Sequence, residues 1–213
     1  MQFSEVLERL AGLPADLPSP PAALMPVRTD GVTDWRPRIQ LDSLAVRPAS
    51  VLVLLYPDED GETHVVLTER VDRGGHHSGE VSFPGGSAEP EDADAAATAL
   101  REAAEEVALD TDAAGVTVVG QLEAFWIPVS NFRVTPILAT AARRPTFVAS
   151  PSEVARVIEA PVRAFLPDSD IEIVERDVRG WPLRYGGYRI DGLHVWGATA
   201  RILGQLGALL AAE

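Results

Sequence analysis

Apolar positions along the chain form short continuous runs, which predict strands, and periodic stretches, which predict helices. Ala49 to Tyr56 is a continuous apolar run, typical of a strand buried on both faces. The turn-forming residues Pro57 to Gly61 follow, and His64 to Thr68 is predicted to be the next strand. These two strands are therefore expected to form a hairpin.

Four stretches have helical character. The strongest runs from Asp92 to Val107, because it is rich in alanine and contains neither Gly nor Pro. Asp92 and Asp94 stand where acidic residues favour a helix start. The other helices are predicted at residues 3–11, 152–165 with an interruption at Pro161, and 196–210, the last of them amphipathic.

The remaining elements indicate the fold class. Further strands are predicted at residues 116–119, 122–127, 133–140, 171–174 and 188–190. Strands mixed with a few helices, without regular alternation, favour an α+β or three-layer α/β/α domain. Residues 13–26 are rich in proline and alanine, so we expect an extended connector that lies on the domain or hangs loose.

Composition narrows the class of protein. A chain of 213 residues with 46% hydrophobic and 23% charged residues has ordinary globular values and can bury a core. No apolar run is long enough to cross a membrane, and residues 1–5 lack the start of a secretory signal, so we expect a cytoplasmic protein. The absence of cysteine excludes disulfides, thiolate metal sites and cysteine nucleophiles.

The formal net charge of −14 bears on possible partners. So acidic a surface disfavours binding to nucleic acid or to an anionic membrane, and neither is an expected partner. A phosphate-bearing substrate would be repelled unless a cation stood between, and Mg²⁺ or Mn²⁺ held by carboxylates would resolve this. Solubility alone is the simpler explanation of the charge. The oligomeric state is left open, a homodimer included.

The predicted helix at 92–107 concentrates acidic side chains on one side. Glu102, Glu105 and Glu106 share an arc of roughly 100° at helical spacing. Such a stripe is either a solvated helix face or a site for a hard divalent cation, which prefers oxygen ligands. Upstream, Gly85 and Gly86 allow close approach of the backbone to a phosphate or to the helix, which favours the metal site over a plain turn.

The glycine pair and the acidic helix together resemble the Nudix hydrolases, whose box reads G-x5-E-x7-R-E-U-x-E-E-x-G-U, with U an aliphatic residue. The pattern is occupied here by Gly86, Asp92, Arg101, Glu102, Ala103, Glu105, Glu106 and Leu109. Asp92 replaces the first Glu, one extra residue precedes Arg101, and Ala108 replaces the late Gly. The resemblance implies a Nudix-type α/β/α sandwich with a mixed sheet, a Nudix hydrolase domain at 46–213, and an N-terminal helix and proline-rich extension at 1–45.

A second motif is similar to the coenzyme A pyrophosphatase branch of that family, L-L-T-x-R-S-x-x-L-R-x-H-x-G-x-V-x-F-P-G-G. The matching positions are Leu67, Thr68, Arg70, His77, Gly79, Val81 and Phe83 to Gly86. Val71 replaces the motif Ser, and Gly74 and Gly75 replace its Leu-Arg pair. The substrate implied is coenzyme A or an acyl derivative, cleaved to 4′-phosphopantetheine and adenosine 3′,5′-bisphosphate.

The resemblance also implies roles for the residues of the box. Glu102 and Glu106 are expected to hold Mg²⁺ or Mn²⁺, and Glu105 to be a further ligand or the general base for a metal-bound water. Arg101 is expected to orient Glu105 and to brace the loop near Asp92. Arg70, His77, Gly85, Gly86 and Phe132 are the expected substrate contacts, and Glu123 and Glu153 are acids outside the box that could act as the base.

Two rival functions stay open. In the first, a Nudix pyrophosphatase acts on ADP-ribose, NADH or another nucleotide, and the glycines at 74 and 75 motivate it. In the second, the chain is a Nudix-fold nucleotide-binding module without catalysis. Retention of all three box acids argues against this second reading.

Overall fold

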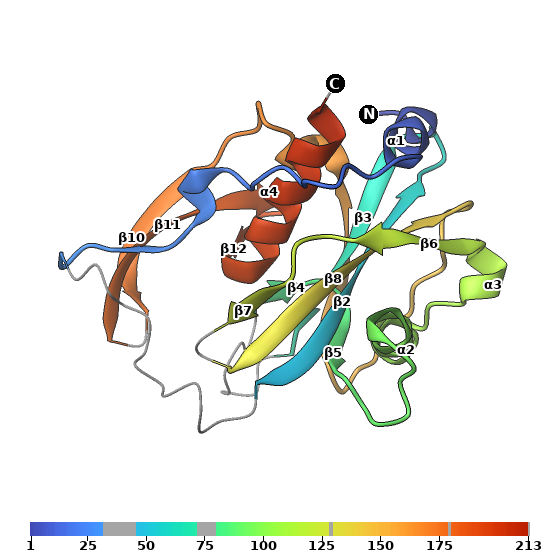
Figure 1. Ribbon diagram of the computed structural model, residues 1–213, viewed down its shortest axis with the longest axis horizontal. Coiled ribbons are helices and arrows are strands. Elements are labelled where there is room, and N and C mark those ends of the chain that lie inside the picture. The colour runs from blue at the N-terminus through green and yellow to red at the C-terminus, as the bar shows by residue number, and fades with distance from the viewer. Residues whose placement is uncertain (32–45, 72–79, 128–129, 179, 213) are drawn as a thin grey trace.

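The computed structural model describes residues 1–31, 46–71, 80–127, 130–178 and 180–212 (Figure 1). The positions of His77, Gly74 and Gly75 fall outside the described residues. The helices are α1 (Phe3–Leu10), α2 (Ala95–Val107), α3 (Thr111–Ala114) and α4 (Gly197–Ala211), with 3-10 turns η1 (Ala22–Leu24) and η2 (Val162–Phe165). The strands are β1 (Val27–Arg28), β2 (Arg47–Pro57), β3 (Thr63–Arg70), β4 (Val81–Ser82), β5 (Gly85–Ser87), β6 (Val116–Gln121), β7 (Phe125–Ile127), β8 (Phe132–Ala141), β9 (Val154–Pro161), β10 (Glu172–Val178), β11 (Trp181–Ile190) and β12 (Leu193–Trp196).

The larger sheet is mixed. Its main path is β4-β3-β2-β8-β6, with β5 on β2, β7 on β8 and β9 on β3. Strands β2 and β8 run parallel, from Arg47 opposite Phe132 to Leu55 opposite Thr140, and the other pairs are antiparallel. The predicted hairpin of β2 and β3 is confirmed, with Leu55 opposite Val65.

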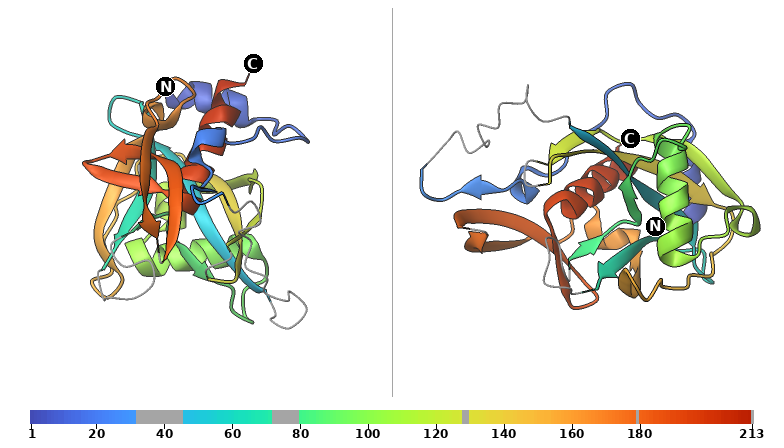
Figure 2. Two further views of the ribbon diagram at one scale, coloured as in Figure 1. Left: turned by 90° about the vertical axis from the view of Figure 1, so that its left-hand side faces the viewer. Right: turned by 90° about the horizontal axis from the view of Figure 1, so that it is seen from below.

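Strand β2 is apolar from Val51 to Tyr56 because helices cover both faces of the sheet. Leu52 and Leu54 pack with Ala103 of α2, in one core cluster. Val53 and Leu55 point the other way and pack in a second cluster that contains much of α4. Helix α2, the sheet and α4 thus form the layers of the expected α/β/α sandwich (Figure 2), and the predicted fold class is confirmed.

A smaller sheet lies on the outer side of α4 (Figures 1 and 2). Its order is β1-β11-β10, and β12 also pairs with β11. Tyr188, Ile190 and Val195 of this sheet are buried in the cluster that contains α4. The sequence predicted only parts of it: the strand expected at 188–190 is the end of β11, which begins at Trp181.

One predicted helix is wrong. Residues 152–165 form β9 and the turn η2 instead of a helix interrupted at Pro161. β-branched residues suit a pleated strand, and Val154, Ile158 and Ala160 are buried along this one. Strand β9 pairs with β3 from Pro161 opposite His64 to Val154 opposite Arg70. The tertiary pairing therefore overrides a weak helical pattern.

The N-terminal residues lie against the domain. Val6 and Leu10 of α1, and Leu24 in the connector, are buried in the cluster that contains α4. The amino group of Met1 pairs with Glu62 at 2.8 Å. The helix predicted at 3–11 is confirmed, and the proline-rich connector continues along the domain surface (Figure 1).

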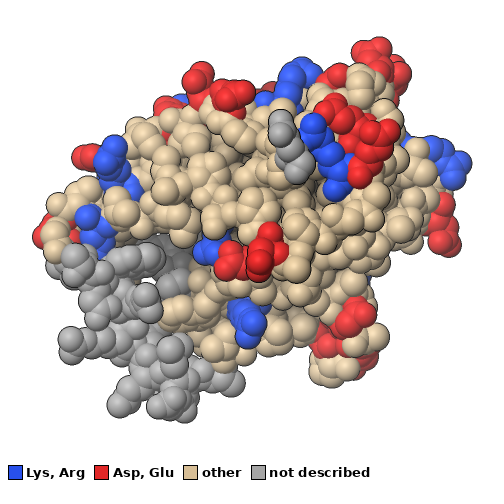
Figure 3. All heavy atoms as spheres, turned by 45° about the horizontal axis from the view of Figure 1, so that its top comes forward, with Lys and Arg blue, Asp and Glu red and all other residues tan. Residues whose placement is uncertain are grey.

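Helix α4 buries ten of its 15 residues, more than the amphipathic helix that the sequence predicts. Among the described residues, no helix has both the length and the hydrophobicity of a membrane span. On the face drawn in Figure 3, acidic side chains occur in small groups with basic side chains beside them. Charge of one sign does not form a single patch on that face.

Candidate active site

Helix α2 begins and ends at defined residues, and this fixes the direction of its acidic side chains. Asp94 caps the helix by accepting a hydrogen bond from the Ala97 amide at 2.8 Å, so the helix starts at Ala95, three residues later than Asp92. Ala99 and Ala103 are fully buried against the sheet. Ala108 ends the helix in the left-handed conformation with φ 53°, at the position of the family's late Gly.

The three predicted acids have very different surroundings. The side chain of Glu106 is 3% exposed, that of Glu102 15%, and that of Glu105 60%. Glu106 and Glu102 therefore face the loop before the helix, whereas Glu105 is largely in solvent.

The glycine pair lies directly against two of these acids. The Gly85 amide donates to Glu106 Oε2 at 3.2 Å. Gly85 has φ 155°, and a Cβ there would collide with the backbone of Ser50 and Val51. A Cβ on Gly86 would lie 2.5 Å from the carboxylate carbon of Glu102. Both glycines are thus needed for the loop to close onto the helix.

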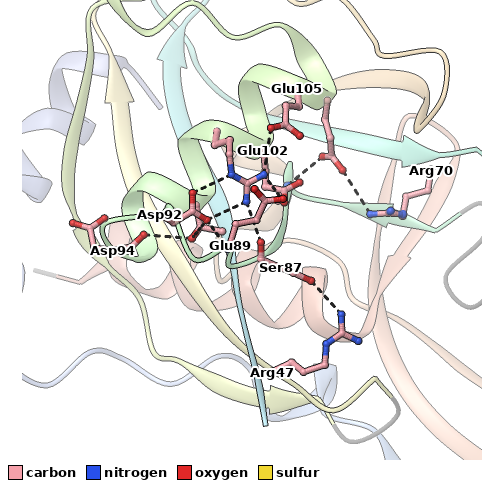
Figure 4. Close-up of polar contacts among 12 residues, drawn as sticks. Arg47, Arg70, Ser87, Glu89, Asp92, Asp94, Glu102 and Glu105 are labelled. Atoms are coloured by element: carbon pink, nitrogen blue, oxygen red, sulfur yellow. Dashed lines mark hydrogen bonds and ion pairs between the residues drawn. The ribbon is translucent and has the colours of Figure 1, made fainter. Parts of the chain in front are cut away.

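Arg101 joins the acidic helix to the loop, whose residues Ser87 and Asp92 lie close to Glu102 (Figure 4). Its Nε donates to Asp92 Oδ1 at 3.0 Å, and its Nη2 donates to the Ser87 carbonyl at 3.0 Å. Its Nη1 lies 3.1 Å from Glu102 and 3.3 Å from Glu105. The hydrogen bonds from Arg101 hold the pKa of Asp92 well below its usual range. Asp92 therefore remains ionised and ties the loop to Arg101.

The buried pair of carboxylates is electrostatically unfavourable as it stands. Burial raises the pKa of Glu106 to about 7, an effect that the Gly85 amide and Arg70 oppose and that Glu102 and Glu153 reinforce. Burial also raises the pKa of Glu102, with Arg101 acting against it. Two desolvated acids beside a third favour proton uptake or a cation.

Two segments distant in the sequence meet this pair. The Ser150 amide donates to the Glu106 carbonyl at 2.8 Å, and Glu153 caps the same turn through a 3.0 Å bond to the Ser150 carbonyl. The Val71 amide donates to the Glu153 carbonyl at 3.0 Å, which brings the end of β3 to this turn. Arg70 Nη1 then lies 3.7 Å from Glu106 Oε1. The sequence offered no spacing that would have linked Glu153 to Glu106.

A family model described as NUDIX domain matches residues 46–164, which include the loop, the acidic helix and the Glu153 turn. The chain belongs to the Nudix family. It is 38% identical over 168 residues to Nudix hydrolase 15, mitochondrial, of Arabidopsis thaliana, covering 76% of this chain and 58% of the relative. The chain thus spans little more than half the length of that plant protein.

Two bacterial Nudix proteins complete the comparison. The Nudix hydrolase NudL of Enterobacter sp. (strain 638) is 36% identical over 176 residues, covering 80% of this chain and 86% of NudL. The solved structure of a MutT/nudix family protein from Enterococcus faecalis aligns with 79% of this chain and 61% of its own, at 16% identity and a TM-score of 0.48.

Nudix hydrolases generally depend on divalent metal ions, and the acids of the Nudix helix are the residues that would hold one here. Within the described ranges, no three acidic or histidine side chains already converge as a ligand set. The donors nevertheless fit a hard divalent cation, because Glu102 and Glu106 supply desolvated oxygens that lack sufficient counter-charge. Glu105 and Glu153 add further carboxylates at the solvent side.

Of the other predicted site residues, Phe132 lies beside the Gly85–Gly86 loop and Glu123 lies beside α4. Phe132 lies 4.3 Å from the Arg47 guanidinium, and Arg47 reaches Ser87 Oγ at 3.4 Å, so Phe132 adjoins the loop. Glu123 pairs with Arg201 of α4 at 3.2 Å and is not among the groups acting on Glu102 or Glu106. Sequence reasoning missed Arg47, whose only signal was its place beside the apolar run of β2.

Proposed function

We propose that this protein hydrolyses a diphosphate bond in a nucleoside diphosphate derivative, with Mg²⁺ or Mn²⁺ as cofactor. The observation that carries the proposal is the pair Glu102 and Glu106, held in a partly desolvated position under the Gly85–Gly86 loop. Such a pair binds a hard cation well, and a cation is what an acidic protein needs to accept an anionic substrate.

Each residue has a separate task in this proposal. Glu102 and Glu106, with Glu105 beside them, hold the cation. When bound, the cation neutralises the diphosphate and lowers the pKa of a coordinated water. Arg101 keeps Glu102 and Glu105 in place and ties the helix to Asp92. The Gly85 and Gly86 backbone packs directly against the two carboxylates, with no side chain between the loop and the acids.

Two acids are candidates for the general base that accepts the proton of the attacking water. Glu105 is exposed and held by Arg101 at 3.3 Å. Glu153 stands on a turn bonded to the backbone of Glu106, and its charge acts on both Glu102 and Glu106. We favour Glu153, because Glu105 already serves as a partner of Arg101. Glu153→Gln should then lower kcat far more than Glu105→Gln does.

Coenzyme A or an acyl derivative is the proposed substrate, with 4′-phosphopantetheine and adenosine 3′,5′-bisphosphate as products. The motif from Leu67 to Gly86 supports this choice. Arg70, 39% exposed and directed at the acidic pair, is the proposed phosphate contact, and Phe132 and His77 are further proposed contacts. ADP-ribose or NADH is the second candidate, because Gly74 and Gly75 replace the Leu-Arg pair of the coenzyme A motif.

The test is a panel assay of coenzyme A, ADP-ribose and NADH with Mg²⁺ and with Mn²⁺, with the products identified by mass spectrometry. Coenzyme A should be cleaved faster than the others, to the two products named. Turnover of coenzyme A no better than that of ADP-ribose would reject it as the substrate. Absence of any turnover in the panel would favour the third function, a nucleotide-binding module.

A matched pair of variants tests the site itself. Glu106→Gln should abolish turnover while the circular dichroism spectrum stays native, because it removes a charge from the cation site. Glu175→Gln, an exposed change on the small sheet, should leave turnover unchanged. Full activity in Glu106→Gln would refute the assigned role.

Three sequence predictions remain predictions. These are the division into an extension at 1–45 and a Nudix domain at 46–213, the cytoplasmic location, and the open possibility of a homodimer. The burial of Val6 and Leu10 in the same core as α4 bears on the first, since removal of α1 would expose that core. Limited truncation before residue 46, followed by a thermal melt, would test it.

A further inference from the structure

The small sheet has a face that α4 does not cover. Tyr188 and Ile190 of β11 point into the core with α4, so the alternate residues Tyr185 and Gly187 point away from it. On β12, Val195 points to the core, and His194 and Trp196 lie on the side of Tyr185. We refer to the side that carries Tyr185, Gly187, His194, Trp196 and, on β10, Arg176 as the outer face.

Three aromatic rings are stacked on the outer face. The ring centroids of Tyr185 and Trp196 are 4.7 Å apart with an interplanar angle of 29°, and those of Tyr185 and His194 are 6.0 Å apart at 21°. The stack depends on Gly187, since a Cβ there would collide with the His194 ring. The partly exposed Trp196 ring presents flat apolar surface, which suits a planar heteroaromatic ligand, and the buried Tyr185 ring packs beside it.

Arg176 lies over this stack. Its guanidinium carbon is 5.6 Å from the centroids of both the Tyr185 and the Trp196 rings. Three other arginines of the sheet have a carboxylate partner: Arg28 with Asp30, Arg184 with Glu175 and Arg189 with Glu172. Within the part of the chain that the structure describes, Arg176 forms no such ion pair. It is therefore an available cation in a chain of net charge −14.

Two polar atoms of the stack are buried without a partner. Tyr185 is 1% exposed, and neither its hydroxyl nor His194 Nε2 has a hydrogen-bond partner among the described residues. Burial lowers the pKa of His194, which favours the neutral ring and leaves one ring nitrogen as an acceptor near neutral pH. A buried hydroxyl and a buried acceptor without partners are costly unless a ligand supplies them.

The outer face is linked to the acidic site through β4. Trp196 precedes α4 directly, and Thr199 Oγ1 donates to the Val81 carbonyl at 2.8 Å. Val81 lies opposite Glu69 in the pairing of β4 with β3, and the next residue, Arg70, is the one 3.7 Å from Glu106. The stack and the carboxylates are therefore connected through the short strand β4 and the end of β3, which suits a substrate with two separate parts.

We propose that the outer face binds the adenine nucleotide part of the substrate, with the base on the Tyr185–Trp196 rings and its phosphate on Arg176. The exposed guanidinium moves off the rings to pair with the phosphate, and the base takes its place. The proposed function is needed only to identify this ligand as part of the substrate. The site itself rests on the residues of the outer face.

The test is isothermal titration of the purified full chain with adenosine 3′,5′-bisphosphate in EDTA, so that the cation site makes no contribution. Arg176→Gln should weaken binding about tenfold or more, because it removes a charge-assisted bond to phosphate. Tyr185→Phe keeps the ring that packs beside the base, and should change binding much less than Arg176→Gln does. Arg184→Gln is the matched control: it lies on the same sheet but on the opposite face, and should bind as the unaltered chain does.

Adenosine and inorganic pyrophosphate serve as probes of the two halves of the ligand. Each should bind more weakly than the bisphosphate. Equal binding of the bisphosphate by Arg176→Gln and the unaltered chain would overturn the site. The site would also be overturned if the unaltered chain bound pyrophosphate as tightly as the bisphosphate. If coenzyme A is not hydrolysed but the loss in Arg176→Gln is observed, the proposed function fails and the site stands. If hydrolysis is observed without that loss, the site fails and the function stands.

Discussion

Removing the charge of Glu106 is expected to stabilise the fold at alkaline pH while it destroys the cation site. Burial raises the pKa of this side chain from 4.5 to about 7, and the side chain is 3% exposed. At a pH between 4.5 and about 7, the native state therefore keeps the Glu106 proton that the unfolded chain has already released. Stability supplied by the protonated form is complete below pH 4.5 and is lost as the pH rises through about 7.

The magnitude follows from the difference between the two pKa values. A shift from 4.5 to about 7, at about 1.4 kcal/mol per unit, makes ionised Glu106 cost the folded state about 3 kcal/mol at pH 8. Glu106→Gln has no charge to desolvate, and its amide oxygen can still accept the Gly85 N–H bond. In EDTA, the free energy of unfolding of the variant should exceed that of the unaltered chain by up to about 3 kcal/mol at pH 8 and by much less at pH 5.

Urea denaturation followed by circular dichroism at pH 5 and pH 8 measures this difference. Glu105→Gln is the matched control, because it makes the same change on the same helix at a side chain that is 60% exposed. Its unfolding free energy should change little at either pH. The reasoning is refuted if Glu106→Gln unfolds at the same urea concentration as the unaltered chain at pH 8, or if its advantage is the same at both pH values.

Three further predictions concern the same helix and its cofactor. Ala108→Gly should raise the free energy of unfolding by roughly 1 kcal/mol in urea denaturation, because Ala108 adopts a left-handed conformation with φ 53°; a loss of stability would contradict this. Gly86→Ala should lower kcat/KM on the order of 10²-fold with the fold retained, because its Cβ would displace the Glu102 carboxylate, and unchanged kinetics would exclude that displacement. Mg²⁺ added at pH 8 should raise the melting temperature of the unaltered chain but not that of Glu106→Gln, and an equal shift in both would place the cation elsewhere.

Much of the acidic site was predictable because it is local. The alanine-rich stretch ending at Val107 forms a helix by its own propensity, and helical spacing then places Glu102, Glu105 and Glu106 on one side. The apolar run from Ala49 to Tyr56 likewise required burial on two faces, which a sheet between two helices provides. These features depend on periodicity, which a single sequence displays.

Other features required the folded chain. Residues 154–161 became a strand because β3 offered an edge to pair with, and a periodicity argument does not include the partner. The different burial of the three acids depends on segments that are distant in the sequence. So do the contact of the Gly85 amide with Glu106, 21 positions away, and the nearness of Glu153 to Glu106, 47 positions away. The sequence determined which groups carry the chemistry. The tertiary structure decided which of them are desolvated, because burial depends on what the rest of the chain packs against them.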